Sequence, residues 1–324
     1  MMTNVYQLSD RLFLIDAMDL NRKGRTGTYV LKEDQLTIIE TSASPSIPYI
    51  LDGLKQLDLS PEDIKYIIVT HIHLDHAGGA GLLLKHCKDA KVVVHPRGAR
   101  HLADPSRLIK GARAVYGEKF DQLFDPILPI PEERLIIKEH GETLDISTTC
   151  RLTFYDTPGH ARHHFSIHDS VSNGIFSGDT IGIYYDELKK DGIDLILPST
   201  SPNQFDPDEM LQSTSLIESL NVKSIYFSHF GVCHDPNKVF SAVRKWVPIF
   251  MEACETGLKN VSHDNMKEAI QAVESKLVEK VKDYLSSLGV PDDHEIYDIL
   301  SLDLQVCAMG LVDYFVKKKS MEAN

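Results

Sequence analysis

The sequence predicts an α/β fold: a sandwich of two β-sheets with helices on its outer faces (αββα), followed by a helical extension. Two observations indicate this. Up to about residue 231, short runs rich in β-branched and aromatic residues alternate with turn signals and a few helical stretches. After Pro236 the pattern changes to long segments with apolar residues at three- and four-residue intervals. We therefore expect a sandwich domain over residues 1–235 and a helical extension over 236–324 packed on it.

The strands and helices follow from local patterns. Strand-like runs lie at residues 26–32, 35–41, 64–70, 91–96, 151–157, 164–170, 174–180 and 222–230. Helices are expected at residues 47–57, 79–86 and 97–116, and in the extension at 237–260, 265–289 and 295–319. Another helix begins at Asp206, where an aspartate cap, Pro207 in the first turn and Glu209 three residues on form a start signal.

Composition restricts the partners of the protein. The chain has 324 residues, 42% hydrophobic and 25% charged, which is typical of a globular protein, and a net charge of −13 disfavours binding to nucleic acid. We expect a small-molecule substrate, and no nucleic-acid or membrane partner, because no apolar run approaches membrane-spanning length. Five widely spaced cysteines without a CxxC pair indicate reduced thiols and a cytoplasmic protein.

The segment THIHLDHAGG, residues 70–79, places three histidines and an aspartate directly after an apolar strand. Residues two apart in an extended segment point to the same side, so His71 and His73 can converge on one point. Asp75 and His76 follow where the chain must turn, and can converge on a second point nearby. Imidazole and carboxylate groups suit zinc, iron or manganese, so the segment predicts two adjacent metals.

Three more ligand candidates each stand between an apolar strand and a glycine-bearing turn. His160 lies in DTPGH, Asp179 in IFSGD and His229 in YFSHFG. Functional side chains often occupy such loops at the edge of a rigid sheet. We expect these loops to complete the metal site.

The ordered motifs THIHLDH, TPGH, SGD and SHFG resemble those of the metallo-β-lactamase-fold superfamily over roughly residues 5–235. The resemblance implies two divalent metal ions per chain, zinc as first choice with iron or manganese as alternatives. It assigns His71, His73 and His160 to the first metal, Asp75, His76 and His229 to the second, and Asp179 to a bridge between them. One departure is Glu40, in IIETSAS, where the family usually has an aspartate that supports the metal loop.

The resemblance implies a metal-dependent hydrolase. Two adjacent metals would supply a bound hydroxide that attacks a carbonyl, with Asp75 as the catalytic group that assists proton movement. An ester, thioester or lactone of a small molecule is the expected substrate. The 50 residues from Asp179 to His229 leave no room for the large inserted domain of nucleic-acid-processing members. The alternatives are an iron-dependent oxidoreductase of the same fold, either sulfur dioxygenase-like or di-iron, and a binding protein with a vestigial site.

Several other residues have two interpretations. Tyr184 and Tyr185 begin a long loop and either anchor it or line a substrate pocket. We expect His164 to support the site and His163 to be exposed. The helical extension must bury its apolar stripes on the sandwich beside the metals or in a homodimer, and we expect it to do both.

Overall fold

The computed structural model describes residues 4–259, 261 and 265–322, and its chain divides into two compact units. Unit 1 consists of Met1–Thr157, His163–Gly178 and Val222–Pro236, and unit 2 of Pro158–Arg162, Asp179–Asn221 and Asn237–Asn324. The predicted boundary at residues 235 and 236 thus lies next to a join between units. The helical extension, however, shares its unit with two earlier segments of the chain.

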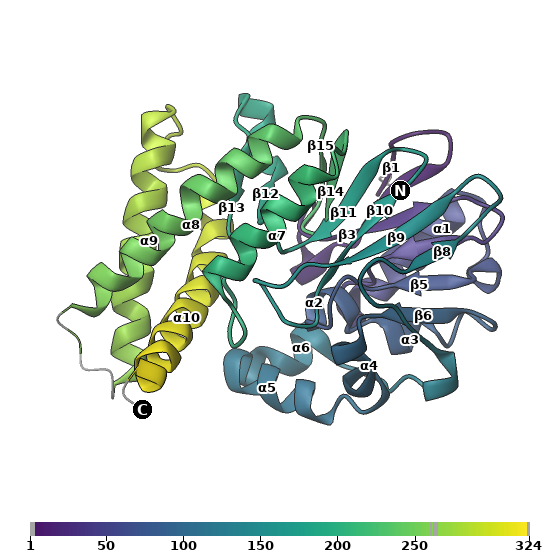
Figure 1. Ribbon diagram of the computed structural model, residues 1–324, viewed down its shortest axis with the longest axis horizontal. Coiled ribbons are helices and arrows are strands. Elements are labelled where there is room, and N and C mark those ends of the chain that lie inside the picture. Colours follow the sequence, from purple (N-terminus) through teal and green to yellow (C-terminus); the bar gives the residue numbers. More distant parts are fainter. Residues whose placement is uncertain (1–3, 260, 262–264, 323–324) are drawn as a thin grey trace. The chain divides into compact units, whose positions relative to one another are not determined.

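Unit 1 contains two β-sheets (Figure 1). One sheet has seven strands in chain order: β1 (Val5–Gln7), β2 (Leu12–Asp16), β3 (Gly27–Leu31), β4 (Thr37–Ile39), β5 (Tyr66–Ile68), β6 (Lys91–Val94) and β7 (Leu135–Ile137). The other has six in the order β15 (Val232–Cys233), β14 (Ser224–Phe227), β11 (Gly174–Gly178), β10 (Phe165–Asp169), β9 (Arg151–Asp156) and β8 (Thr143–Asp145). The eight strand-like runs of the sequence are all strands in these sheets, and the five further strands are β1, β2, β7, β8 and β15.

Apolar side chains extend from both faces of the seven-stranded sheet, and both faces are covered, one by the six-stranded sheet and the other by helices. Successive strand residues point to opposite faces. One set packs against the six-stranded sheet; it includes Tyr29, Ile39, Ile68 and Val93, with Phe154, Phe165 and Phe176 opposite. Their neighbours on the other face pack against helices; they include Val30, Ile38, Ile67 and Val92. Unit 1 is therefore held together by two apolar layers, and the sheet between them carries almost continuous apolar runs.

The helices of unit 1 include the three expected ones, one of them broken in two, and two short helices that were not expected. They are α1 (Ile47–Gln56), α2 (Leu74–Ala77), α3 (Ala80–Leu83), α4 (Pro96–Ala103), α5 (Ser106–Tyr116) and α6 (Phe120–Phe124), and the unexpected ones are α2 and α6. The single helix expected over residues 97–116 is two helices, because Asp104 is extended (φ −130°, ψ 95°) ahead of Pro105. A residue before proline avoids the helical region, so the chain bends there.

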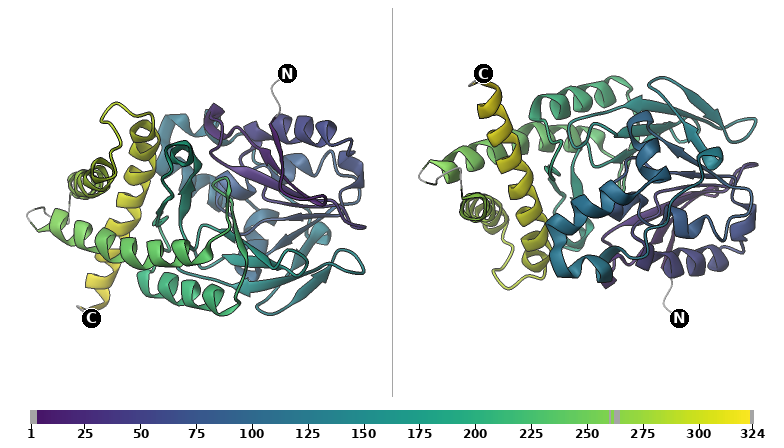
Figure 2. Two further views of the ribbon diagram at one scale, coloured as in Figure 1. Left: turned by 90° about the horizontal axis from the view of Figure 1, so that it is seen from above. Right: turned by 90° about the horizontal axis from the view of Figure 1, so that it is seen from below.

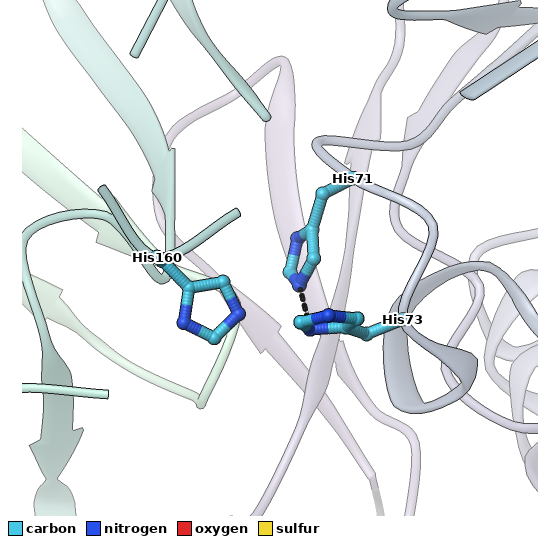
Figure 3. A group of neighbouring side chains, drawn as sticks. All are labelled: His71, His73 and His160. Carbon is cyan, nitrogen blue, oxygen red and sulfur yellow. Dashed lines mark hydrogen bonds between the residues drawn. The ribbon is translucent and has the colours of Figure 1, made fainter. Parts of the chain in front are cut away.

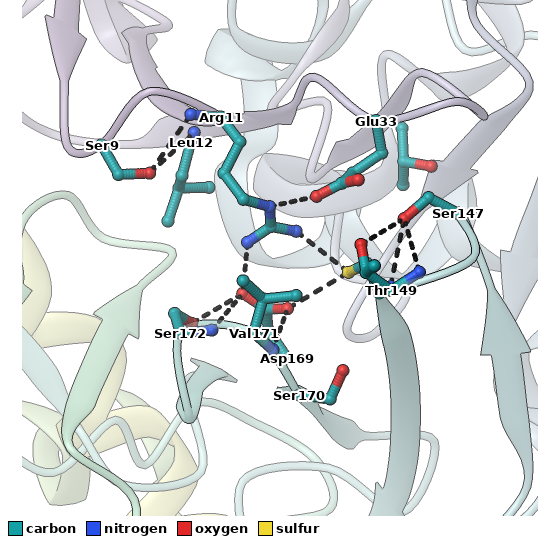
Figure 4. Close-up of polar contacts among 12 residues, drawn as sticks. Ser9, Arg11, Leu12, Glu33, Ser147, Thr149, Asp169, Ser170, Val171 and Ser172 are labelled. Carbon is teal, nitrogen blue, oxygen red and sulfur yellow. Dashed lines mark hydrogen bonds and ion pairs between the residues drawn. The ribbon is translucent and has the colours of Figure 1, made fainter.

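A partly buried charged cluster lies in unit 1 at Arg11 (Figure 4). The guanidinium pairs with Glu33, lies 2.7 Å from Oδ2 of Asp169 and donates from Nη2 to Sγ of Cys150 at 3.0 Å. Ser172 donates its hydroxyl to the same oxygen of Asp169. Buried charges are costly unless paired and hydrogen-bonded, and this cluster meets both conditions. It joins β2, β10 and the segment before β9.

Unit 2 contains a two-stranded sheet and four long helices among its described residues (Figure 2). The strands are β12 (Ile183–Tyr185) and β13 (Leu195–Leu197), and the helices are α7 (Pro207–Ser219), α8 (Pro236–Leu258), α9 (Met266–Ser287) and α10 (Ile296–Glu322). Asp206 caps α7 as predicted, since its side chain accepts hydrogen bonds from the amides of Asp208 and Glu209.

The stretch after Asp179, expected to be a loop, contains the β12–β13 hairpin, in which Tyr184 is opposite Ile196. Both tyrosines are buried and bound at their hydroxyls. Tyr184 donates to Oδ1 of Asp194 at 2.9 Å, and Tyr185 to Oδ2 of Asp303 at 3.1 Å. These contacts favour the anchoring interpretation of the two tyrosines over a pocket wall.

The helical extension buries its large apolar residues within the fold. Trp246, Phe250 and Leu300 are buried, and the Trp246 ring lies 5.1 Å from that of Tyr284 on the next helix. Contrary to the sequence expectation, one described helix, Ile296–Met321, is long and apolar enough to cross a membrane by length and composition. A core helix passes the same test, and 44% of its most apolar stretch is buried.

Candidate metal centre

The first histidine pair lies where the chain leaves β5. Nε2 of His71 lies 3.0 Å from Nδ1 of His73, while Nδ1 of His71 lies 3.0 Å from the hydroxyl of Thr70 (Figure 3). His73 is the residue before the first turn of α2 and is still extended (φ −62°, ψ 149°). The extended segment therefore presents both imidazoles to one side, as the spacing predicted.

The second group consists of Asp75, His76 and His229, all in unit 1. Oδ2 of Asp75 lies 3.6 Å from Nε2 of His76 and 3.6 Å from Nε2 of His229. One candidate ligand atom from each residue lies within 4.8 Å of the others. Two ligands of one tetrahedral zinc ion are about 3.4 Å apart, so this set of two nitrogens and one oxygen fits a divalent metal.

Unit 2 contributes the other two candidates, His160 and Asp179. Nδ1 of His160 donates to the carbonyl oxygen of Ser199 at 2.9 Å, and this fixes the proton on Nδ1 because a carbonyl can only accept. Nε2 therefore presents its lone pair, and it lies 3.7 Å from Oδ2 of Asp179. The Ser199 hydroxyl donates to the same carboxylate oxygen at 3.2 Å. One serine thus orients both candidate ligands.

Both of these ligand candidates lie within a few residues of a join between the two units. His160 lies in Pro158–Arg162, a five-residue segment with Thr157 before it and His163 after it in unit 1. Asp179 directly follows Gly178, the last residue of β11. Figure 3 draws His160 with His71 and His73, the three imidazoles that the sequence assigns to the first metal.

Glu40 connects two of the segments that bear ligand candidates, residues 70–79 and the loop with His229. It adopts a left-handed backbone conformation (φ 70°) after β4 and is buried. Its Oε1 accepts from the amide of Thr70 and from the hydroxyl of Ser228, each at 3.1 Å, and its Oε2 lies 3.5 Å from Nδ1 of His76. A carboxylate at Nδ1 favours the tautomer that leaves Nε2 as the metal ligand. Glutamate thus has the supporting contacts expected of an acid at this position.

His164 is fully buried, and its Nδ1 lies 3.0 Å from the hydroxyl of Thr157. Its ring packs over Gly178, where a Cβ would lie 2.2 Å from Nε2 of His164 and 2.8 Å from the Thr70 hydroxyl. Gly178 also has a φ of +53°, so both space and conformation require glycine immediately before Asp179.

His163 is buried, so the expectation that it is exposed is wrong. Its ring packs edge-on against His73, with centroids 5.3 Å apart, and stacks parallel to His71 at 6.2 Å. Strict alternation along an extended segment would bury only one of two adjacent residues. The turn between His160 and β10 instead buries both.

Sequence reasoning also missed Asp19, which lies in a short 3-10 turn, Asp19–Asn21, and is buried. Burial raises the pKa of its carboxyl group, the guanidinium of Arg25 at 3.3 Å opposes the rise, and the charge of Asp75 adds to it. Asp16 holds this loop, accepting from the amides of Met18 and Gly24. No motif in the sequence marks these residues, since their proximity to the second ligand group arises from the fold.

Comparison with known proteins supports the family resemblance that the motifs indicate. The family model described as the metallo-beta-lactamase superfamily matches residues 23–229. The metallo-beta-lactamase fold-containing protein ST1585 of Sulfurisphaera tokodaii is 30% identical over 208 residues, which are 63% of this chain and 72% of that protein. The crystal structure of the ST1585 protein has a TM-score of 0.60 at 25% identity, and covers 73% of this chain and 86% of that one.

Two further relatives extend the comparison. The structure of the TTHA1429 protein from Thermus thermophilus has a TM-score of 0.68 at 17% identity and covers 97% of this chain and 95% of that one, so it shows the fold alone, C-terminal helices included. A protein named nitric oxide reductase from Moorella thermoacetica is 22% identical over 275 residues, 76% of this chain and 62% of that one. The predicted αββα fold class with C-terminal helices is confirmed. Because the family model matches most of the chain, the protein belongs to the metallo-beta-lactamase superfamily.

Proposed function

We propose that the protein is a metal-dependent hydrolase that cleaves an ester, thioester or lactone bond in a small molecule. The observation that carries this proposal is the set of oriented donors. Nδ1 of His160 donates to the Ser199 carbonyl, and the Glu40 carboxylate lies 3.5 Å from Nδ1 of His76, so in each ring Nε2 is the nitrogen left for a metal. Imidazoles held in this way are typical of metal ligands.

The proposed site has seven ligands. His71, His73 and His160 would hold one divalent ion, Asp75, His76 and His229 a second, and Asp179 would contact both. Zinc suits neutral imidazoles with carboxylates, and iron or manganese would accept the same donors. When bound, two such ions would lower the pKa of a shared water molecule and polarise the carbonyl group of the substrate.

Among these candidates we propose Asp75 as the catalytic group. Its side chain is 28% exposed, whereas those of His76 and His229 are 1% and 6% exposed. Its Oδ2 lies 3.6 Å from Nε2 of each of these two histidines. We assign to Asp75 the acceptance of a proton from the attacking water and its later delivery to the leaving group.

The second candidate reaction is iron-dependent oxidation or reduction. It is favoured by the relatives named nitric oxide reductase, 22% identical, and rubredoxin-oxygen oxidoreductase from Megalodesulfovibrio gigas, also 22% identical. Against it, every non-carboxylate donor in the proposed site is an imidazole, including His73, and this set of ligands is typical of zinc hydrolases.

The five cysteines are all buried thiols outside any disulfide, which supports a reducing, cytoplasmic environment.

The test combines metal analysis with a substrate panel. Protein from metal-replete growth is expected to hold about two zinc ions per chain and to hydrolyse at least one of a set of small esters, thioesters and lactones. Asp75→Asn is expected to abolish turnover, while Asp208→Asn, an exposed aspartate in α7, leaves it unchanged. One metal or none per chain would contradict the two-metal site. Iron in the protein, with turnover of a persulfide or of dioxygen only, would favour the second candidate.

A further inference from the structure

The helix α10 contacts the segment over residues 198–203 along a single stripe. Asp303, Cys307, Gly310 and Lys317 recur at intervals of four, three and seven residues, so they lie on one face of the helix. Tyr185 donates to Oδ2 of Asp303, Thr200 donates its hydroxyl to the carbonyl oxygen of Cys307 at 2.9 Å, and Lys317 donates to the carbonyl oxygen of Asn203 at 2.6 Å. All of these residues belong to unit 2.

The closest approach on this stripe is at Gly310. A Cβ there would lie 1.7 Å from the carbonyl oxygen of Thr200, so no other residue fits without movement of the segment. One turn earlier, the Cys307 thiol lies 3.5 Å from the carbonyl oxygen of Pro198. The residues on either side of Ser199 are therefore both in direct contact with α10.

Ser199 is the residue that orients the two metal-ligand candidates of unit 2. Its carbonyl oxygen accepts from Nδ1 of His160, and its hydroxyl donates to Oδ2 of Asp179. The charge of Asp179 is close enough to contribute to the raised pKa of Cys307, about 11, after burial as the main cause. Helix α10 thus contacts residues 198 and 200, and Ser199 between them contacts the two ligand candidates.

We infer that α10 is a positioning element of the metal centre: by fixing Pro198 and Thr200 it holds Ser199 where it orients His160 and Asp179. This inference rests on the metal-binding part of the proposed function and goes beyond it, since it gives the helical extension a role in metal affinity. Loss of a group that supports a metal ligand weakens affinity by roughly 10- to 100-fold. A disturbance of α10 on this stripe is expected to act on that scale, although α10 supplies no ligand.

The experiment uses the full-length protein, stripped of metal and titrated with Zn²⁺ alone against a chromophoric chelator. Gly310→Ala drives a methyl group into Thr200 and is expected to weaken Zn²⁺ binding by roughly 10- to 100-fold. The matched control is Gly111→Ala in α5, where nothing lies within 4 Å of the added Cβ, and Zn²⁺ affinity is expected to stay unchanged. Thermal unfolding of the metal-free proteins shows whether each variant is folded.

Two smaller substitutions, both at Thr200, test the inference if Gly310→Ala does not fold. Thr200→Val keeps the shape of the side chain but removes the hydroxyl that donates to Cys307, and is expected to weaken Zn²⁺ binding. Thr200→Ser restores the hydroxyl and is expected to restore affinity. The visible spectrum of Co²⁺-substituted protein reports the geometry of the ligands, and is expected to change in Thr200→Val and to return in Thr200→Ser.

The outcomes separate this inference from the proposed reaction. Wild-type affinity and an unchanged Co²⁺ spectrum in a folded Thr200→Val or Gly310→Ala variant would overturn the positioning role and leave the hydrolase proposal standing. Weakened binding in the variants, with a wild-type protein that binds Zn²⁺ but hydrolyses nothing, would support the positioning role and overturn the reaction. A wild-type protein that binds no Zn²⁺ overturns both.

Discussion

Oε2 of Glu40 lies 3.5 Å from Nδ1 of His76, and both side chains are almost completely buried. The other oxygen of Glu40 accepts from Thr70, next to His71, and from Ser228, next to His229. A single carboxylate therefore faces one ligand candidate and holds the residues next to two others. The family's usual aspartate is one methylene shorter, so a glutamate here changes the reach of the support and keeps its chemistry.

The first prediction concerns that support. Glu40→Gln keeps the length of the side chain but removes the negative charge facing His76, and is expected to lower Zn²⁺ affinity by roughly 10- to 100-fold. Competition with a chelator measures the change. Glu33→Gln is the matched control, because Glu33 pairs with Arg11 in the separate, partly buried cluster. Zn²⁺ affinity that is equal in wild type and Glu40→Gln would show that Glu40 only supports the fold.

The second prediction separates a ligand from a neighbour. Asp179→Ala is expected to reduce the metal content of the purified protein by at least one ion per chain, since it removes a charge proposed to contact both metals. His164→Ala removes a buried ring that packs over Gly178 and binds Thr157, and is expected to lower stability with a smaller loss of metal. Elemental analysis and thermal unfolding measure both effects. Equal metal losses in the two variants would contradict this division of roles.

The third prediction concerns acid stability and the Arg11 cluster. Burial alone would raise the pKa of Asp169, but the Ser172 hydroxyl and the Arg11 guanidinium outweigh it and lower the pKa below its usual value. A carboxyl group with a lowered folded-state pKa stabilises the protein above its unfolded-state pKa of about 4, and this stabilisation is lost as the pH falls through the folded-state value. Asp169→Asn is expected to lower the free energy of unfolding by about 3 kcal/mol at pH 7. Because the variant lacks this carboxyl group, its free energy of unfolding is expected to fall less steeply than that of the wild type as the pH decreases.

Denaturant unfolding at several pH values between neutral and acid measures this effect. Asp145→Asn is the control, because Asp145 forms an exposed ion pair with Arg151 whose contribution solvent screens. Its unfolding curve is expected to follow that of the wild type. A stability profile of Asp169→Asn that runs parallel to the wild type through the acid range would refute the assignment.

The fourth prediction concerns the cysteines. Burial raises the pKa of Cys87, Cys150 and Cys254 to about 12. Since the thiolate is the nucleophile, about one part in ten thousand of each is reactive at pH 8. Iodoacetamide at that pH is expected to leave these three unlabelled in the native protein and to label them in urea, as mass spectrometry of peptides would show. Rapid native labelling of any of the three would show that its site opens to solvent.

Local sequence was sufficient for much of the fold, and it also indicated the seven candidate ligands, which stay a prediction. The strand runs, the Asp206 cap and the long helices of the extension each depend on residues near one another in the chain, so periodicity reveals them. The pairing of Tyr184 with Ile196, the burial of His163 and the contact of Ser199 with His160 depend on chain segments that meet only after folding. Such contacts produce no periodic pattern in the sequence. The residues that support the candidate ligands were therefore harder to identify than the candidate ligands themselves.

The contact between Thr200 and Cys307 has a consequence for how the protein is made, because 107 residues separate the two partners. At roughly 5–20 residues per second, the ribosome delivers α10 some 5–20 s after the segment that it holds. During that interval His160 and Asp179 have been synthesised, but the helix that steadies Ser199 has not. Zinc acquisition should therefore follow synthesis of α10, and nascent chains halted before residue 300 should bind the ion weakly.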